Sequence, residues 1–229
     1  VLAAGVGPAA AAAGTATALT VAAVRGAPYD LAVSAGIGGG FAPHAPLGSV
    51  VVADAVVAAD LGAETPDGFA AVTDLGFGTV AHRPPPALVT AVATAIGPAG
   101  ATGTAGATGA ISAVRGTVLT VSTVTGSAER AAALLRRHPD AVAEAMEGFG
   151  VAEAAAAQSV PILEVRAVSN AVGPRDRAAW RIGEALDALA EAFTRAAPVL
   201  ATAAPDLAPA PDPAAPDPDL DLDLEGSQQ

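Results

Sequence analysis

Residues 145–176 place an alanine-rich helical run directly before a short apolar strand, and this succession restricts the possible folds more than any other stretch. Glu147 precedes the helical run, and Arg166 interrupts the apolar strand. Ser169 and Asn170 follow where that strand ends. In an open α/β sheet, ligands bind at the carboxyl ends of the strands. A carboxylate, a guanidinium and a carboxamide that converge there predict a site for a polar small molecule.

Similar elements recur along the chain, separated by turns rich in glycine and proline. Apolar and β-branched runs predict strands at residues 1–4, 29–34, 50–57, 114–124 and 162–168. The patterns between them predict helices at residues 8–24, 84–96, 128–137, 142–158 and 178–196. Ser127 is the expected N-cap of the third helix. A glycine loop at 35–41 and a surface excursion at 61–78 complete this layout. The alternation is typical of an α/β domain with a mixed, mostly parallel sheet.

One domain is expected over residues 1–204, followed by an acidic tail over residues 205–229. A chain of 229 residues is long enough to bury a substantial core. The tail consists mostly of Pro, Asp, Ala and Leu, which predicts disorder because this composition cannot form a core. Since the chain begins at Val1 in the middle of an apolar pattern, we also expect that an N-terminal piece of the domain is missing.

Charge and composition exclude several classes of protein. The formal net charge of −12 argues against nucleic-acid binding, which requires a basic surface. Residues 1–24 carry no charge, but they lack the bulky apolar side chains of a membrane span. The absence of cysteine rules out thiolate metal ligands, and a reducing cytoplasm is expected. His44, His82 and His138 are scattered near prolines, so we expect no metal site, and no cofactor.

The polar candidates also have simpler interpretations. The glycine loop at 35–41 lets the backbone approach a ligand closely, but taken alone the loop favours a tight turn between a strand and a helix. It matches neither the dinucleotide-binding fingerprint nor the phosphate-binding loop of nucleotide triphosphatases. Arg166 could serve only as the buried partner of Glu164 or Glu147. Asn170 could be a turn residue before Gly173.

Three segments together carry a resemblance to a known family. They are GVGPAAAA at residues 5–12, SAGIGGGFAPHAPLGSVVVAD at 34–54 and AMEGFGVAEAAAAQSVPILEVRAVSN at 145–170. In this order they resemble the purine nucleoside phosphorylase/nucleosidase superfamily, and SNAVGPRDRAAW at 169–180 is most similar to the futalosine hydrolase family. The resemblance implies a three-layer α/β/α fold and a homo-oligomer, with a dimer as the expected state. It also implies hydrolysis of futalosine to hypoxanthine and dehypoxanthine futalosine, a step in a bacterial route to menaquinone.

The resemblance implies two catalytic residues, Glu147 and Asn170. Glu147 would hold the ribose 2′- and 3′-hydroxyls, with Arg166 beside its carboxylate. Further substrate-binding residues would line the sugar and the base, and they are Ile37, Gly38, Gly39, Thr123, Val124, Met146 and Ser169. Thr123 and Val124 stand where relatives often carry an aromatic residue against the purine.

Asn170 predicts which purine is bound. Related adenosine-type nucleosidases carry Asp at this position. The NH₂ group of Asn has two donors and can serve N7 and a 6-oxo oxygen together, which predicts a 6-oxopurine such as hypoxanthine. Donation to N7 would stabilise the departing base, and Glu147 would stabilise the positive charge on the sugar. Relatives position the attacking water with a Glu near the chain start, and we expect that residue in the missing piece.

Three other functions remain open at this point. A purine nucleoside phosphorylase would need cationic groups around phosphate, and residues 32–41 contain no Arg. A methylthioadenosine/adenosylhomocysteine-type nucleosidase would release adenine, which Asn170 disfavours. A non-catalytic nucleoside-binding protein would bind its ligand without forming product.

Overall fold

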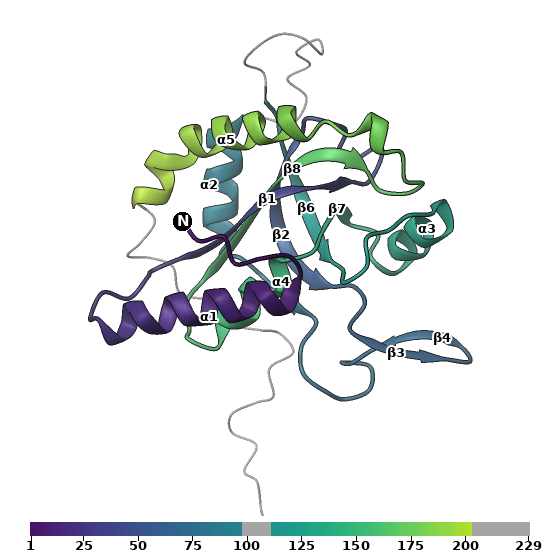
Figure 1. The fold of residues 1–229 in the computed structure, drawn as a ribbon, viewed down its shortest axis with the longest axis horizontal. Helices are drawn as coiled ribbons and strands as arrows, with labels where there is room; N and C mark the ends of the chain where they lie inside the picture. The colour runs from purple at the N-terminus through teal and green to yellow at the C-terminus, as the bar shows by residue number, and fades with distance from the viewer. Residues whose placement is uncertain (98–110, 203–229) are drawn as a thin grey trace, which may run out of the picture.

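A computed structural model describes residues 1–97 and 111–202 (Figure 1). The strands are β1 Ala32–Gly40, β2 Val50–Ala58, β3 Gly62–Thr65, β4 Gly68–Ala71, β5 Ala81–His82, β6 Ala113–Thr120, β7 Ala141–Ala145 and β8 Ile162–Ala171. The helices are α1 Pro8–Val24, α2 Pro86–Ile96, α3 Ala128–Arg137, α4 Gly148–Ala156 and α5 Ile182–Thr202, with a 3₁₀ turn η1 at Arg177–Ala179. The predicted tail at 205–229 lies outside the described residues.

The main sheet is mixed, as the sequence predicted, and it curls until it closes on itself. Its strand order is β5-β2-β6-β7-β1-β8, and β2 also pairs with β8. The pairs β1–β8, β2–β6 and β6–β7 are parallel, whereas β1–β7, β2–β5 and β2–β8 are antiparallel. Strand β1 therefore lies between β7 and β8, and residues of all three strands can face one shared space.

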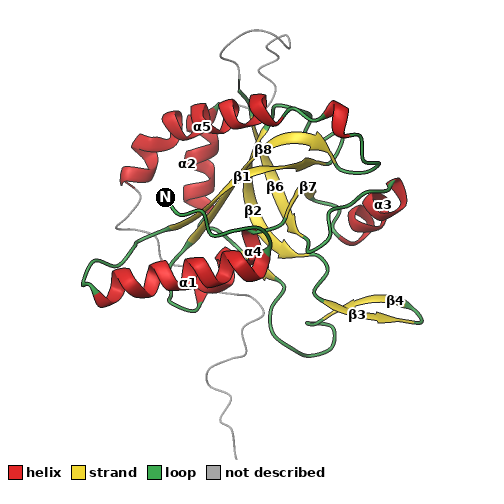
Figure 2. Cartoon of the chain, in the orientation of Figure 1, coloured by secondary structure: helices red, strands yellow, loops and turns green. Residues whose placement is uncertain are grey.

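Helices cover both faces of the sheet and confirm the three-layer arrangement. In Figure 2, α1 and α4 lie on one side of the sheet, and α2 and α5 lie on the other. Strand β2 illustrates why both faces need to be covered. Its side chains alternate between the two faces of the sheet, and they are mostly apolar on both. Val51 packs in a core with residues of α1 and α4, whereas Val50 and Val52 pack with residues of α2 and α5. Burying each such valine contributes roughly 1.5–3 kcal/mol.

The first helix packs tightly on α4 because both carry small side chains. α1 begins at Pro8, which occupies the first helical position as predicted. The helix contacts α4. At Gly150 of α4, a Cβ atom would lie 2.0 Å from the carbonyl oxygen of Pro8. Only glycine fits this contact, which brings the start of α1 against the start of α4. The two segments that meet here, 5–12 and 145–170, are both part of the family resemblance.

Residues 35–40 of the predicted glycine loop are instead the larger part of strand β1. The strand begins at Ala32 and stays paired with β8 as far as Gly40, so the predicted strand at 29–34 is displaced. The glycines do not form a turn. They allow neighbouring side chains and backbone to lie close to the strand. A Cβ at Gly36 would lie 2.6 Å from a guanidinium nitrogen of Arg166, and one at Gly40 would lie 2.1 Å from the carbonyl oxygen of Ala45.

Two other predictions were wrong in type. Residues 1–4 form no strand and run irregularly along the cavity described below. The predicted helix at 142–158 divides into strand β7 and helix α4. The alanines of β7 favour a helix locally, but the segment is buried between β6 and β1, and sheet pairing overrides that propensity.

The remaining elements agree with the sequence to within a few residues. Ser127 caps α3 by accepting the N–H of Arg130 at 3.2 Å. The excursion at 61–78 contains the hairpin β3–β4. Helix α5 was predicted at residues 178–196, but it begins at Ile182 because η1 precedes it, and it continues through Pro198 to Thr202. No helix in the described part of the chain is long and apolar enough to cross a membrane.

Candidate active site

A cavity of about 1380 Å³ opens between the N-terminal residues, strand β1, the start of α4 and one side of α5. We call it the central cavity. It is larger than the roughly 300–1,000 Å³ of ordinary ligand pockets. Nine of the ten predicted site residues line it, and they are Ile37, Gly38, Gly39, Val124, Met146, Glu147, Arg166, Ser169 and Asn170. Thr123 is exposed and does not line the cavity.

Glu147 stands at the N-cap of α4, where strand β7 has just ended. One carboxylate oxygen accepts the backbone N–H of Gly7 at 3.3 Å, and the other accepts from Arg166 at 3.1 Å. Its side chain remains 25% exposed, so further lone pairs face the cavity. The carboxylate is thus held from two sides and can still accept hydrogen bonds from a ligand.

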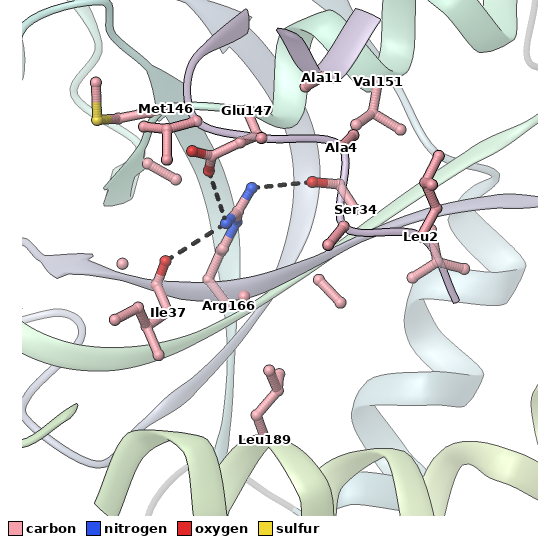
Figure 3. Close-up of a pocket in the computed structure, with 18 of the residues that line it drawn as sticks. Leu2, Ala4, Ala11, Ser34, Ile37, Met146, Glu147, Val151, Arg166 and Leu189 are labelled. Atoms are coloured by element: carbon pink, nitrogen blue, oxygen red, sulfur yellow. Dashed lines mark hydrogen bonds and ion pairs between the residues drawn. The ribbon is translucent and has the colours of Figure 1, made fainter. Parts of the chain in front are cut away.

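Arg166 is the most extensively bonded side chain of the site, as Figure 3 shows. Its guanidinium donates to Glu164 at 2.8 Å, to Glu147 at 3.1 Å, to Ser34 at 2.9 Å and to the carbonyl of Ile37 at 3.4 Å. The side chain is only 4% exposed. Both alternatives foreseen for its partner are therefore realised, because it binds Glu147 and Glu164 at once.

Glu164 is fully buried beneath this arrangement. It lies two residues before Arg166 on β8, which places both side chains on the same face of the strand. Burial raises the pKa of Glu164, and the adjacent Arg166 opposes that rise. Its second oxygen has no hydrogen-bond partner among the described residues. A Cβ at Gly148 would lie 2.2 Å from this carboxylate, so a larger residue at the start of α4 would displace the Glu164 side chain.

Ser169 and Asn170 form the second polar part of the cavity. The Ser169 hydroxyl lies 2.9 Å from Oδ1 of Asn170 and 3.3 Å from the carbonyl of Gly38, and its single proton can serve one of them at a time. Nδ2 of Asn170 donates to the carbonyl of Ala171 at 3.1 Å. One amide hydrogen remains for a ligand in this arrangement, so Asn170 can donate to N7 and to a 6-oxo oxygen together, as predicted, only when its bond to Ala171 is released.

Several lining residues were not predicted from the sequence, and three of them are polar or aromatic side chains next to the predicted site. Ser34 binds Arg166 from β1, Trp180 precedes α5, and Glu144 lies in β7. Glu144 could have been found by the signal that identified Arg166, because it is a charged residue inside an apolar run. Ser34 and Trp180 give no such signal. They reach the cavity through strand pairing and the η1 turn.

A metal centre has no support in the described part of the chain. Across residues 1–97 and 111–202, no group of three or more His, Asp or Glu side chains is placed to hold a metal ion. His82 binds Glu153 at 2.7 Å and lies against the ring of Phe149. Burial and the nearby Arg137 lower the pKa of His138.

Comparison with known proteins identifies the family of this chain. The family model of the phosphorylase superfamily matches residues 1–204. Futalosine hydrolase of Streptomyces coelicolor is 68% identical over 199 residues, which cover 87% of this chain and 78% of that protein. This chain belongs to the phosphorylase superfamily and to its futalosine hydrolase family. Futalosine hydrolase of Acidothermus cellulolyticus is 47% identical, over 72% of this chain and 63% of that protein.

Solved structures confirm the fold of the family. A futalosine hydrolase of Helicobacter pylori superposes with a TM-score of 0.65 at 16% identity, over 86% of this chain and 77% of that one. The 5'-methylthioadenosine/S-adenosylhomocysteine nucleosidase of Neisseria meningitidis superposes with a TM-score of 0.64 at 20% identity, over 84% of this chain and 77% of that one. The nucleosidase fold inferred from the sequence is therefore correct.

Proposed function

We propose that this chain hydrolyses the N-glycosidic bond of futalosine, releasing hypoxanthine and dehypoxanthine futalosine. The observation that carries the proposal is the 68% identity to the futalosine hydrolase of Streptomyces coelicolor. The central cavity supports it, because the segments of the resemblance meet there and its polar groups suit a nucleoside. From the same resemblance we propose that the protein acts in the cytoplasm as a homo-oligomer, with a dimer as the expected state.

In the proposed mechanism, Glu147 stabilises the positive charge that develops on the sugar, and Asn170 stabilises the negative charge that develops on the base. Breaking the glycosidic bond leaves positive charge on the sugar and sends an electron pair to the base. The Glu147 carboxylate, held by Gly7 and Arg166, lies where it can bind the vicinal hydroxyls and stabilise that positive charge. Asn170 donates to N7 of the base. Water then adds its hydroxide to the sugar, and its remaining proton balances the charge of the departing base.

The arginine of the cavity supports water rather than phosphate as the nucleophile. Among the described residues that line the cavity, Arg166 is the one cationic side chain. Its guanidinium already donates to Glu164, Glu147 and Ser34. A phosphorylase site needs positive charge that is available to phosphate, and the two carboxylates neutralise this one.

The deciding experiment measures release of hypoxanthine from futalosine in buffer without phosphate. We expect hydrolysis at a rate that added phosphate does not change. Phosphate-dependent release would instead indicate a phosphorylase. Preferential release of adenine from the 6-amino counterpart of futalosine would indicate an adenosine-type nucleosidase. Binding without release of any base would indicate a nucleoside-binding protein.

The base preference can be tested at Asn170. Replacing it by aspartate is expected to lower kcat/KM for futalosine by about 100-fold, because a carboxylate facing N7 and the 6-oxo oxygen cannot donate to them. The 6-amino counterpart should lose much less, since its amino group can donate to the new carboxylate. A matched control is Gln158→Glu, the same change of amide to carboxylate just after α4, where the side chain contacts α1 and does not line the cavity. An equal loss for both nucleosides in Asn170→Asp would contradict the assignment of the base.

A further inference from the structure

Glu144 is a buried carboxylate of the central cavity that the proposed mechanism does not use. It lies in β7, is 4% exposed and lines the cavity. One carboxylate oxygen accepts the backbone N–H of Thr125 at 2.8 Å, and the other accepts the Thr125 hydroxyl. Burial raises the pKa of Glu144, whereas the bonds from Thr125 oppose the rise. A carboxylate fixed in this way is held in one orientation before any ligand arrives.

Strand pairing sets Glu144 and Asn170 on either side of Gly39. Gly39 of β1 pairs with Glu144 of β7 and with Asn170 of β8. Residues directly opposite each other in a sheet project from the same face. A Cβ at Gly39 would lie 2.9 Å from Cγ2 of Val172 and 3.1 Å from Nδ2 of Asn170, so glycine at this position lets both side chains stay close to the strand. With strands about 4.8 Å apart, the two residues are separated by roughly 10 Å, a distance that a planar base with a hydrogen bond on each side can span.

The hydrogen-bonding capacities of the two residues are complementary. An ionised carboxylate offers about four acceptor sites, of which Thr125 occupies two. A 6-oxopurine carries a hydrogen on N1, whereas N1 of a 6-aminopurine is an acceptor. The N1–H of a 6-oxopurine therefore requires an acceptor next to the position where its oxygen and N7 require a donor.

We propose that Glu144 is a base-specificity residue whose carboxylate accepts the N1–H of a 6-oxopurine, across Gly39 from Asn170. The inference deepens the proposed function and rests on it, because it concerns the base of that substrate. Thr125 acts through Glu144 as a positioning residue. Recognition of the base then comes from an acceptor on β7 and a donor on β8.

The first test begins with the wild-type protein, whose folding no substitution affects. Binding of hypoxanthine and of 1-methylhypoxanthine to the wild-type protein is compared by calorimetry. Because a lost hydrogen bond to a charged group is costly, we expect hypoxanthine to bind about 10- to 100-fold more tightly. The methyl group also adds bulk, so the comparison is repeated in Glu144→Ala, where the preference should nearly vanish. Equal binding of both bases by the wild type overturns the inference.

The second test compares two nucleosides in Glu144→Gln. The ratio of kcat/KM for futalosine to that for its 6-amino counterpart should fall by about tenfold or more, since the glutamine NH₂ can donate to N1 of the amino base. A purely structural role would lower both values equally and leave the ratio unchanged, which overturns the inference. The matched control is Glu64→Gln on the exposed hairpin.

The two tests separate failure of this inference from failure of the proposed function. If the wild type hydrolyses neither nucleoside but still prefers hypoxanthine to its 1-methyl derivative, the proposed function fails and the role of Glu144 in base binding stands. If futalosine is hydrolysed without that preference, the role of Glu144 alone is overturned.

Discussion

Replacing Glu147 by glutamine is expected to lower kcat for futalosine hydrolysis by about 100- to 1000-fold, the range found when a group that stabilises transition-state charge is removed. Glutamine keeps the size of the side chain and an oxygen for the Gly7 N–H, but it loses the negative charge that faces the sugar. The glutamine also cannot pair with the charge of Arg166. Because the positive charge on the sugar develops only in the transition state, kcat should fall further than KM rises.

Glu153→Gln is the matched control, since it makes the same change in the same helix. Glu153 points to the surface and binds His82, so hydrolysis should stay within about twofold of wild type. Both variants are assayed with saturating futalosine after their folding is checked by circular dichroism. A Glu147→Gln protein with wild-type kcat would remove Glu147 from the mechanism.

The largest expected effect on stability comes from Arg166→Met. Removing the guanidinium leaves Glu164 buried without a counter-charge, and breaking a buried pair in this way costs about 3–5 kcal/mol. The loss is measured as the free energy of unfolding in urea. It should largely disappear in Arg166→Met combined with Glu164→Leu, because the double variant buries no charge at this position.

The pH dependence of Arg166→Met provides a second measurement. In this variant burial still raises the pKa of Glu164, and no arginine opposes the rise. At mildly acidic pH the folded protein then holds a proton that the unfolded chain has released, so stability falls as the pH rises through that range. The deficit relative to wild type should therefore be smaller at about pH 5 than at about pH 8. A deficit that is independent of pH and persists in the double variant would mean that Arg166 stabilises the fold through packing alone.

Elements with an unambiguous local pattern could be predicted from the sequence. α1 follows a Gly-Pro start, α3 follows a serine cap, and β2 is a continuous run of apolar residues. Segments whose structure depends on distant partners could not. β7 is an alanine-rich stretch that becomes a strand only because β6 and β1 lie on either side of it. β1 is extended through its glycines only because β8 pairs with it along its whole length.

The same distinction between local patterns and distant partners applies to the candidate site. Arg166 and Glu147 are visible in the sequence because each is a charge in apolar surroundings, and the structure joins them. That Arg166 binds both Glu147 and Glu164 depends on how closely β8 approaches α4, which no local pattern records. Glu144 was missed because its segment was predicted as a helix. Only the register of β7 against β1 places it opposite Gly39.

The glycines of β1 also affect how a site of this kind can diverge during evolution. At Gly36, Gly38 and Gly39, the middle of the cavity is lined by main-chain atoms. Main-chain atoms are the same in every residue, so they cannot change the specificity of the site. A methyl group at Gly36 would come within 3.0 Å of Arg166, and one at Gly38 would come within 3.0 Å of the Glu144 carbonyl. Substitutions at these two positions are therefore disfavoured. A descendant of this protein could therefore change its preferred nucleobase mainly through the flanking strands, while the strip between them stays constant.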